Sequence, residues 1–175
     1  MIRHLLLLSL PAFSATALTG TSTAAPEPQP RHCQVPCGIY GDRMRIDMLM
    51  EDASTIEKGM RMISELEADG GAANQLVRWI MNKDEHAAAI QENVASYWLA
   101  QRIKAPKTDD AAAQKTYYRQ LELLHGITVQ AMKCKQTTDP QHVGKLRAHA
   151  LSFSEIYFDE GDLEHIRSHH DGSGK

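Results

Sequence analysis

Hydrophobic residues recur every three or four positions from residue 43 to about residue 157, with polar residues between them. This spacing places the hydrophobic side chains on one face of an α-helix, and no long run of alternating β-branched residues suggests a sheet. Gly70-Gly71, Pro106 and Asp139-Pro140 interrupt the pattern and divide it into four segments. Four amphipathic helices joined by short loops predict an all-α protein folded as an antiparallel four-helix bundle over 43–160.

The first two expected helices have clear ends. The first carries its apolar stripe from residue 46 to residue 66, and Gly70-Gly71 stops it. The second is expected from about residue 74 to residue 104, where Pro106 prevents further helix. Both segments are long enough to form the opposite sides of a bundle.

The last two expected helices have capping residues at their starts. The third is expected to begin near 108–110, whose side chains can accept hydrogen bonds from exposed backbone N–H groups, and to turn Met132 inward. The fourth begins at Asp139, because the proline that follows loses no hydrogen bond in the first helical turn. Gly161 marks its expected stop, and 161–175 is expected to be a polar, histidine-containing tail.

Composition is that of one ordinary globular domain. The chain has 175 residues, of which 42% are hydrophobic and 23% are charged, so one core is the expectation. Its formal net charge of −3 argues against a nucleic-acid partner bound by a basic surface. Three cysteines exclude a framework of several disulfides. One of them, Cys134, is expected to be a partly buried and unreactive thiol.

The N-terminal residues resemble a secretory signal. A basic start is followed by an apolar stretch with small residues at candidate cleavage sites. Pro11 interrupts this stretch, so no stable membrane anchor is expected. The run PEPQPR at 26–31 should stay extended and accessible to a maturation protease, which would remove 1–31. Export to the periplasm or the extracellular space is therefore expected, with the cytoplasm after leader removal as the alternative.

Cleavage before His32 would give the sequence HCQVPCGIY at 32–40 a particular chemistry. The free α-amine of His32 and the backbone nitrogen of Cys33 can close a five-membered ring on one metal ion. The thiolates of Cys33 and Cys37 add two donors, and the His32 imidazole can reach above the plane. A square-planar site with an optional axial ligand favours Ni(II) or Cu(II) over tetrahedral zinc. A short-loop disulfide between the two cysteines is the alternative.

The same nine residues match every fixed position of the pattern HCxxPCGxY, and the chain therefore resembles the nickel-containing superoxide dismutases. The similarity continues more loosely through RWIMNKDEHA at 78–87 to Tyr97-Trp98. The resemblance implies a four-helix-bundle enzyme, usually a homohexamer, with an N-terminal nickel-binding hook at 32–42 and one nickel ion per chain. It implies disproportionation of superoxide to oxygen and hydrogen peroxide through a Ni(II)/Ni(III) cycle.

The resemblance also implies roles for individual residues. His32, Cys33 and Cys37 would bind nickel, and Tyr40 would lie over the open face of the metal, where its hydroxyl could order water, superoxide or peroxide. Asp47 would hydrogen-bond the axial imidazole and fix its orientation.

Two alternatives remain open at this point. Some members of the family place an arginine where this chain has His86. We expect His86 to lie at a seam between helices or on the surface. The less favoured interpretation is that His86 supports the acidic partner of the axial imidazole. The alternative function is an exported helical bundle that binds metal or contains a disulfide and has no catalytic turnover.

Overall fold

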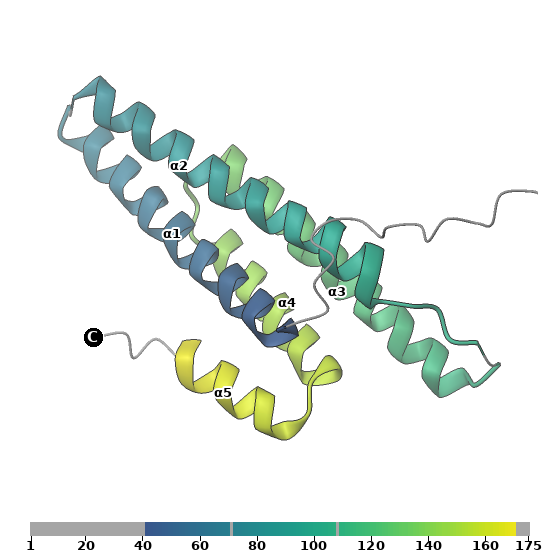
Figure 1. Ribbon diagram of the computed structural model, residues 1–175. Coiled ribbons are helices and arrows are strands. Elements are labelled where there is room, and N and C mark those ends of the chain that lie inside the picture. The colour runs from purple at the N-terminus through teal and green to yellow at the C-terminus, as the bar shows by residue number, and fades with distance from the viewer. Residues whose placement is uncertain (1–40, 71, 108, 171–175) are drawn as a thin grey trace, which may run out of the picture. The chain divides into compact units, whose positions relative to one another are not determined.

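The computed structural model describes residues 41–70, 72–107 and 109–170, and these residues form helices without any strand. The helices are α1 (Asp42–Ala68), α2 (Ala73–Glu92), η1 (Asn93–Arg102), α3 (Ala111–Gln136), α4 (Gln141–Tyr157) and α5 (Glu160–His170). The π-helix η1 directly continues α2. The all-α prediction is confirmed (Figure 1).

The first four α-helices form a bundle in which each contacts two neighbours. Helix α1 packs against α2, α2 against α3, α3 against α4, and α4 back against α1 (Figure 1). Their inward faces form one core, in which Trp98 is fully buried. Other core residues are Ile46, Leu49, Ala53, Ile56 and Met60 of α1, Ala87 and Ile90 of α2, Leu124, Ile127 and Ala131 of α3, and Val143, Leu146, Ala150 and Phe153 of α4.

Two helix starts agree with the predicted caps. The side chain of Asp110 accepts a hydrogen bond from the backbone N–H of Ala112 at 2.9 Å. Asp139 Oδ1 accepts one from the backbone N–H of Gln141 at 3.0 Å. Each carboxylate satisfies a backbone donor that has no partner within its helix, and this fixes where α3 and α4 begin.

The inward face of α3 differs from the prediction. Met132 is 45% exposed, whereas Leu123, Ile127 and Cys134 are buried. Apolar residues occur on two neighbouring faces of this helix, so the periodicity alone did not determine which face packs inward.

The C-terminal segment also differs from the expected tail. Helix α4 ends at Tyr157 rather than at Gly161, and 160–170 form the separate helix α5 (Figure 1). Leu163 and Ile166, three residues apart, turn to one side of α5 and are buried. Helix α5 packs against α1. Burial of these two side chains explains why the segment is helical.

None of the helices in the described part of the chain is long and apolar enough to cross a membrane.

Candidate metal centre

The predicted nickel ligands His32, Cys33 and Cys37, together with Tyr40, lie outside the described residues, as does the leader 1–31. Within the ranges that the structure does describe, no three His, Cys, Asp or Glu side chains are grouped so that they could bind a metal ion. The described residues closest to the predicted ligands are those at the start of α1, at one end of the bundle.

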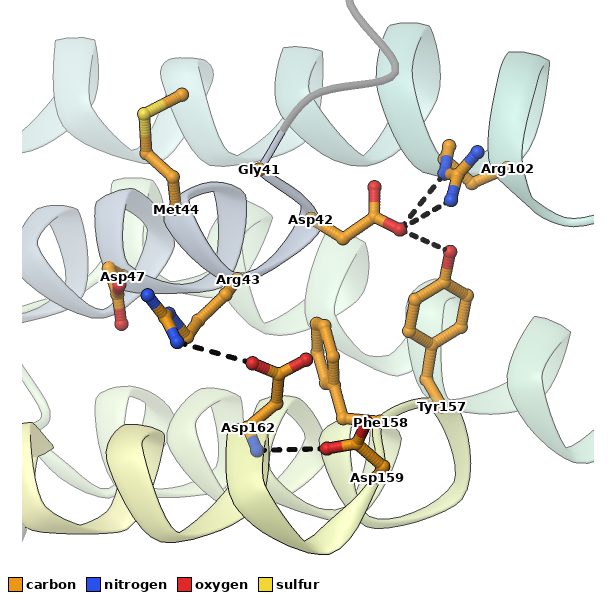
Figure 2. Close-up of a pocket in the computed structure, with 10 residues that line it drawn as sticks. All are labelled: Gly41, Asp42, Arg43, Met44, Asp47, Arg102, Tyr157, Phe158, Asp159 and Asp162. Atoms are coloured by element: carbon orange, nitrogen blue, oxygen red, sulfur yellow. Dashed lines mark hydrogen bonds and ion pairs between the residues drawn. The ribbon is translucent and has the colours of Figure 1, made fainter.

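An open cleft of about 680 Å³ lies where α1 begins. Its walls come from the first turns of α1, the end of η1, the end of α4 and the start of α5 (Figure 2). Gly41 lines it together with seven polar residues, which are Asp42, Arg43, Asp47, Arg102, Tyr157, Asp159 and Asp162. The segment that precedes Gly41 is thus joined to the bundle at this cleft.

Asp42, the first residue of α1, accepts hydrogen bonds from three side chains. The Tyr97 hydroxyl donates to Oδ1, and the Tyr157 hydroxyl donates to Oδ2 at 2.7 Å. The Arg102 guanidinium donates to Oδ2 through Nε at 3.1 Å and also through Nη2 (Figure 2 draws the Arg102 and Tyr157 bonds). We call Asp42 and these three donors the Asp42 cluster. It joins the start of α1 to η1 and to the last residue of α4.

The π-helical segment explains how two of these donors reach one carboxylate. Tyr97 and Arg102 are five residues apart, and in an α-helix such residues point about 140° away from each other. In η1 the backbone bonds instead join residues five apart, as the Ile103 N–H shows by donating to the Trp98 carbonyl at 2.9 Å. One helical turn then separates Tyr97 from Arg102, and both can face Asp42.

The cluster fixes the charge of each member. Burial alone would raise the pKa of Asp42, but the hydrogen bonds from Arg102, Tyr97 and Tyr157 outweigh it and lower the pKa below the ordinary value. Burial and the hydrogen bond to Asp42 raise the pKa of Tyr97 and of Tyr157 to about 12 each. At neutral pH Asp42 is therefore ionised and both tyrosines are neutral donors.

A sequence model of the family described as nickel-containing superoxide dismutase matches residues 22–160 of the chain. The chain belongs to this family. No curated protein and no solved structure gives a significant match. Membership confirms the predicted enzyme class, an oxidoreductase that acts on superoxide, and its nickel cofactor. The matched range contains the hook and α1 to α4.

Asp47, the residue predicted to orient the axial imidazole, lines the cleft of this nickel superoxide dismutase. Its side chain is 33% exposed, and its Oδ2 lies 3.9 Å from Nε2 of His165 in α5. Arg43 and Asp162 also join α1 to α5, at 3.2 Å. The helix that the sequence analysis missed thus forms one side of the cleft. The expected contact of Asp47 with His32 involves a residue outside the described ranges and stays a prediction.

His86 lies at the seam between α2 and α1, as predicted. Its Nδ1 is 2.7 Å from Oδ1 of Asp52, one and a half turns beyond Asp47 on α1. In this nickel superoxide dismutase, His86, which stands where some members have an arginine, therefore contacts Asp52 and not Asp47, the carboxylate predicted to face the axial imidazole.

Cys134 is fully buried in α3, and burial raises the pKa of its thiol to about 11. The thiol is fully rather than partly buried, and its raised pKa agrees with the predicted low reactivity, since the thiolate is the reactive form. The carbonyl of the same residue accepts a hydrogen bond from the buried Lys83 ammonium at 2.7 Å, which ties α3 to α2.

The Asp42 cluster was not predicted from the sequence. From the sequence, Asp42 was expected at the end of the hook, and neither tyrosine hydroxyl was given a partner. One signal was available, because a tyrosine on a buried face needs a partner for its hydroxyl. The sequence did not show which residue would accept the hydrogen bond from each tyrosine hydroxyl.

Proposed function

We propose that this nickel superoxide dismutase binds its metal through His32, Cys33 and Cys37 after cleavage of the Arg31–His32 bond. The observation that carries the proposal is the complete HCxxPCGxY pattern at 32–40, inside the family match and immediately before α1. Cleavage matters because only a free His32 amine can complete the chelate with the Cys33 backbone nitrogen.

The donor set fits nickel. Two thiolates and a deprotonated amide would be strong anionic donors, which stabilise the higher oxidation state of a metal ion, and such sulfur and nitrogen donors suit Ni(II). When bound, nickel supplies one-electron redox chemistry between its divalent and trivalent states, as the disproportionation of superoxide to oxygen and peroxide requires. The polypeptide sets the donor geometry and controls access to the site.

Two further residues have proposed roles at this site. Asp47 accepts a hydrogen bond from the His32 imidazole and so fixes which ring nitrogen faces the metal. Its position on the cleft that Gly41 also lines supports this role. Tyr40 lies next to Gly41 in the sequence, and its hydroxyl would order water, superoxide or departing peroxide at the site.

Processing, location and assembly complete the proposal. The basic and apolar leader supports export to the periplasm or the extracellular space, with the cytoplasm as the alternative, and 26–31 offers the maturation protease an extended substrate. Homo-oligomerisation, as a hexamer by family resemblance, is supported by three exposed apolar side chains of α2. These are Val77 at 53%, Ile80 at 38% and Met81 at 66% exposure.

The test compares three cysteine substitutions in the full-length chain matured by its host. Cys33→Ala and Cys37→Ala are expected to abolish nickel binding and superoxide consumption while leaving the helical circular dichroism unchanged. Cys134→Ala is the matched control, because that thiol is buried in α3, and it should retain both. Mass spectrometry of active wild-type enzyme should give an N-terminus at His32, and metal analysis should give one nickel per chain.

Active enzyme that retains the Arg31–His32 bond, or full turnover in Cys33→Ala, would overturn the proposal. A chain that binds metal but consumes no superoxide would instead support the non-catalytic alternative.

A further inference from the structure

The Asp42 cluster lies at the junction between the bundle and the hook. Asp42 is the first residue of α1, and Gly41 before it has the left-handed φ of +82°. Tyr40 and Cys37 precede Asp42 by two and five positions. An extended chain spans at most roughly 3.6 Å per residue. The chain length alone therefore limits the Cα–Cα distance from Asp42 to about 7 Å for Tyr40 and to about 18 Å for Cys37. Any displacement of Asp42 therefore moves the origin of the hook.

The donors of the cluster are themselves held firmly. The Tyr97 ring packs edge-on against Trp98 with a centroid distance of 5.3 Å, and the Arg45 guanidinium lies over its face at 4.7 Å. The Tyr157 ring packs against the same Trp98 at 5.0 Å. Since Trp98 is fully buried, both tyrosine rings are anchored in the core of the bundle, and their hydroxyls reach Asp42 from there.

We propose that Asp42, held by Tyr97, Tyr157 and Arg102, is a positioning residue for the nickel centre: it fixes where the hook leaves the bundle and thereby the place of the metal relative to the cleft. The inference rests on the proposed function, because it takes the motif at 32–40, within the predicted hook, as the nickel site. Asp42 acts through the backbone and does not bind the metal.

The location of the cluster separates this role from a general role in stability. Asp42 begins its helix, so loosening it frees the junction at Gly41, while the apolar face of α1 from Ile46 onward stays packed. The hook would then take a wider range of positions relative to Asp47. Residues that orient metal ligands from outside typically change metal affinity or activity about 10-fold to 100-fold when replaced, and a residue acting through the backbone belongs at the lower end.

The experiment compares Asp42→Asn with Asp52→Asn in the matured, nickel-loaded enzyme. Asp52 is a close control, because it lies on the same helix and its side chain is equally exposed at 18%. It also has an ionisable partner, the His86 imidazole. The measured quantities are the rate of nickel loss to excess chelator, the electron paramagnetic resonance spectrum of trivalent nickel, and kcat for superoxide, with circular dichroism to monitor the fold.

Asp42→Asn is expected to lose nickel about 10-fold faster than wild type, with an altered or broadened nickel spectrum and unchanged helix content. Asp52→Asn is expected to keep the wild-type rate and spectrum. Equal nickel loss and equal spectra in Asp42→Asn and wild type would overturn the proposal, as would the same changes in both variants.

If Asp42→Asn does not fold, Tyr157→Phe carries the test, because it removes one donor and keeps the carboxylate. It should change nickel loss and the spectrum in the same direction by a smaller factor, and wild-type behaviour would overturn the proposal. Cys33→Ala, measured in parallel, distinguishes the two levels of inference. If Cys33→Ala retains nickel, the hook is rejected as the metal site. If Cys33→Ala loses nickel while Asp42→Asn behaves like wild type, only the positioning role is rejected.

Discussion

Asp42 and Asp52 both belong to α1, and their side chains are equally exposed at 18%, yet their surroundings shift their pKa values in opposite directions. Burial raises the pKa of Asp52, and one hydrogen bond from His86 only partly offsets it. The pKa of Asp42 is lowered because three donors outweigh its burial. The two carboxylates differ in their neighbours, because a guanidinium and two hydroxyls surround Asp42, whereas Asp52 has one imidazole and the Glu51 carboxylate nearby. The residue with three donors is the one at the end of the predicted hook.

The largest expected difference between the two sites is in the free energy of unfolding. Asp42→Ala should cost about 3 kcal/mol, because it leaves a partly buried guanidinium and two tyrosine hydroxyls without their acceptor. Asp52→Ala should cost about 1 kcal/mol, because it removes one hydrogen bond. Urea unfolding followed by circular dichroism, at one protein concentration, measures both. Equal costs would show that the cluster adds nothing beyond an ordinary pair.

A smaller effect is expected from the tyrosine donors. Tyr97→Phe and Tyr157→Phe should each cost about 1 kcal/mol, since each removes one hydrogen bond and keeps the ring that packs on Trp98. In an Asp42→Ala background the same substitutions should cost almost nothing, whereas in an Asp52→Ala background they should keep their full cost. Double-mutant cycles on the unfolding free energy provide this measurement. Full cost in both backgrounds would place the role of the hydroxyls outside the cluster.

The smallest effect is a difference in the pH dependence of stability. Because the folded pKa of Asp42 lies below its unfolded value, its contribution is present at neutral pH and is lost as the pH falls through the folded pKa. Asp52 has a folded pKa above its unfolded value, so its protonation on acidification favours the folded state. On acidification toward the ordinary aspartate pKa of 3.8 and below, wild type should lose stability relative to Asp42→Asn and gain it relative to Asp52→Asn. Unfolding free energies measured for each pair across this range test the two signs, and the same sign in both pairs would contradict them.

Local signals explain what the sequence predicted of the fold. The bundle followed from apolar spacing, and Asp110 and Asp139 marked helix starts because a cap needs only a side chain and a neighbouring backbone N–H. Helix α5 escaped prediction because only Leu163 and Ile166 are buried in a segment that is otherwise mostly polar. The π-helical turn of η1 could not be read either, because its apolar residues also fit an ordinary helical period.

At the site, too, features that depend on neighbouring residues could be predicted, and those that depend on distant residues could not. The proposed ligands lie within six consecutive residues, so a short motif was enough to identify them. The donors of Asp42 lie 55, 60 and 115 positions away from it in the chain. Only the packing of α1, η1 and α4 brings those donors together, and periodicity carries no information about which polar ends meet.

The burial of Cys134 has a practical consequence for an enzyme whose product is an oxidant. A thiol with a pKa of about 11 inside the core presents almost no thiolate to hydrogen peroxide, so we expect this sulfur to resist oxidation. If Cys33 and Cys37 are the ligands, as proposed, alkylating reagents applied to the reduced, metal-free native fold should label these two sulfur atoms and leave Cys134 unlabelled. Cys134 becomes reactive only when the helices separate, and its labelling reports global unfolding.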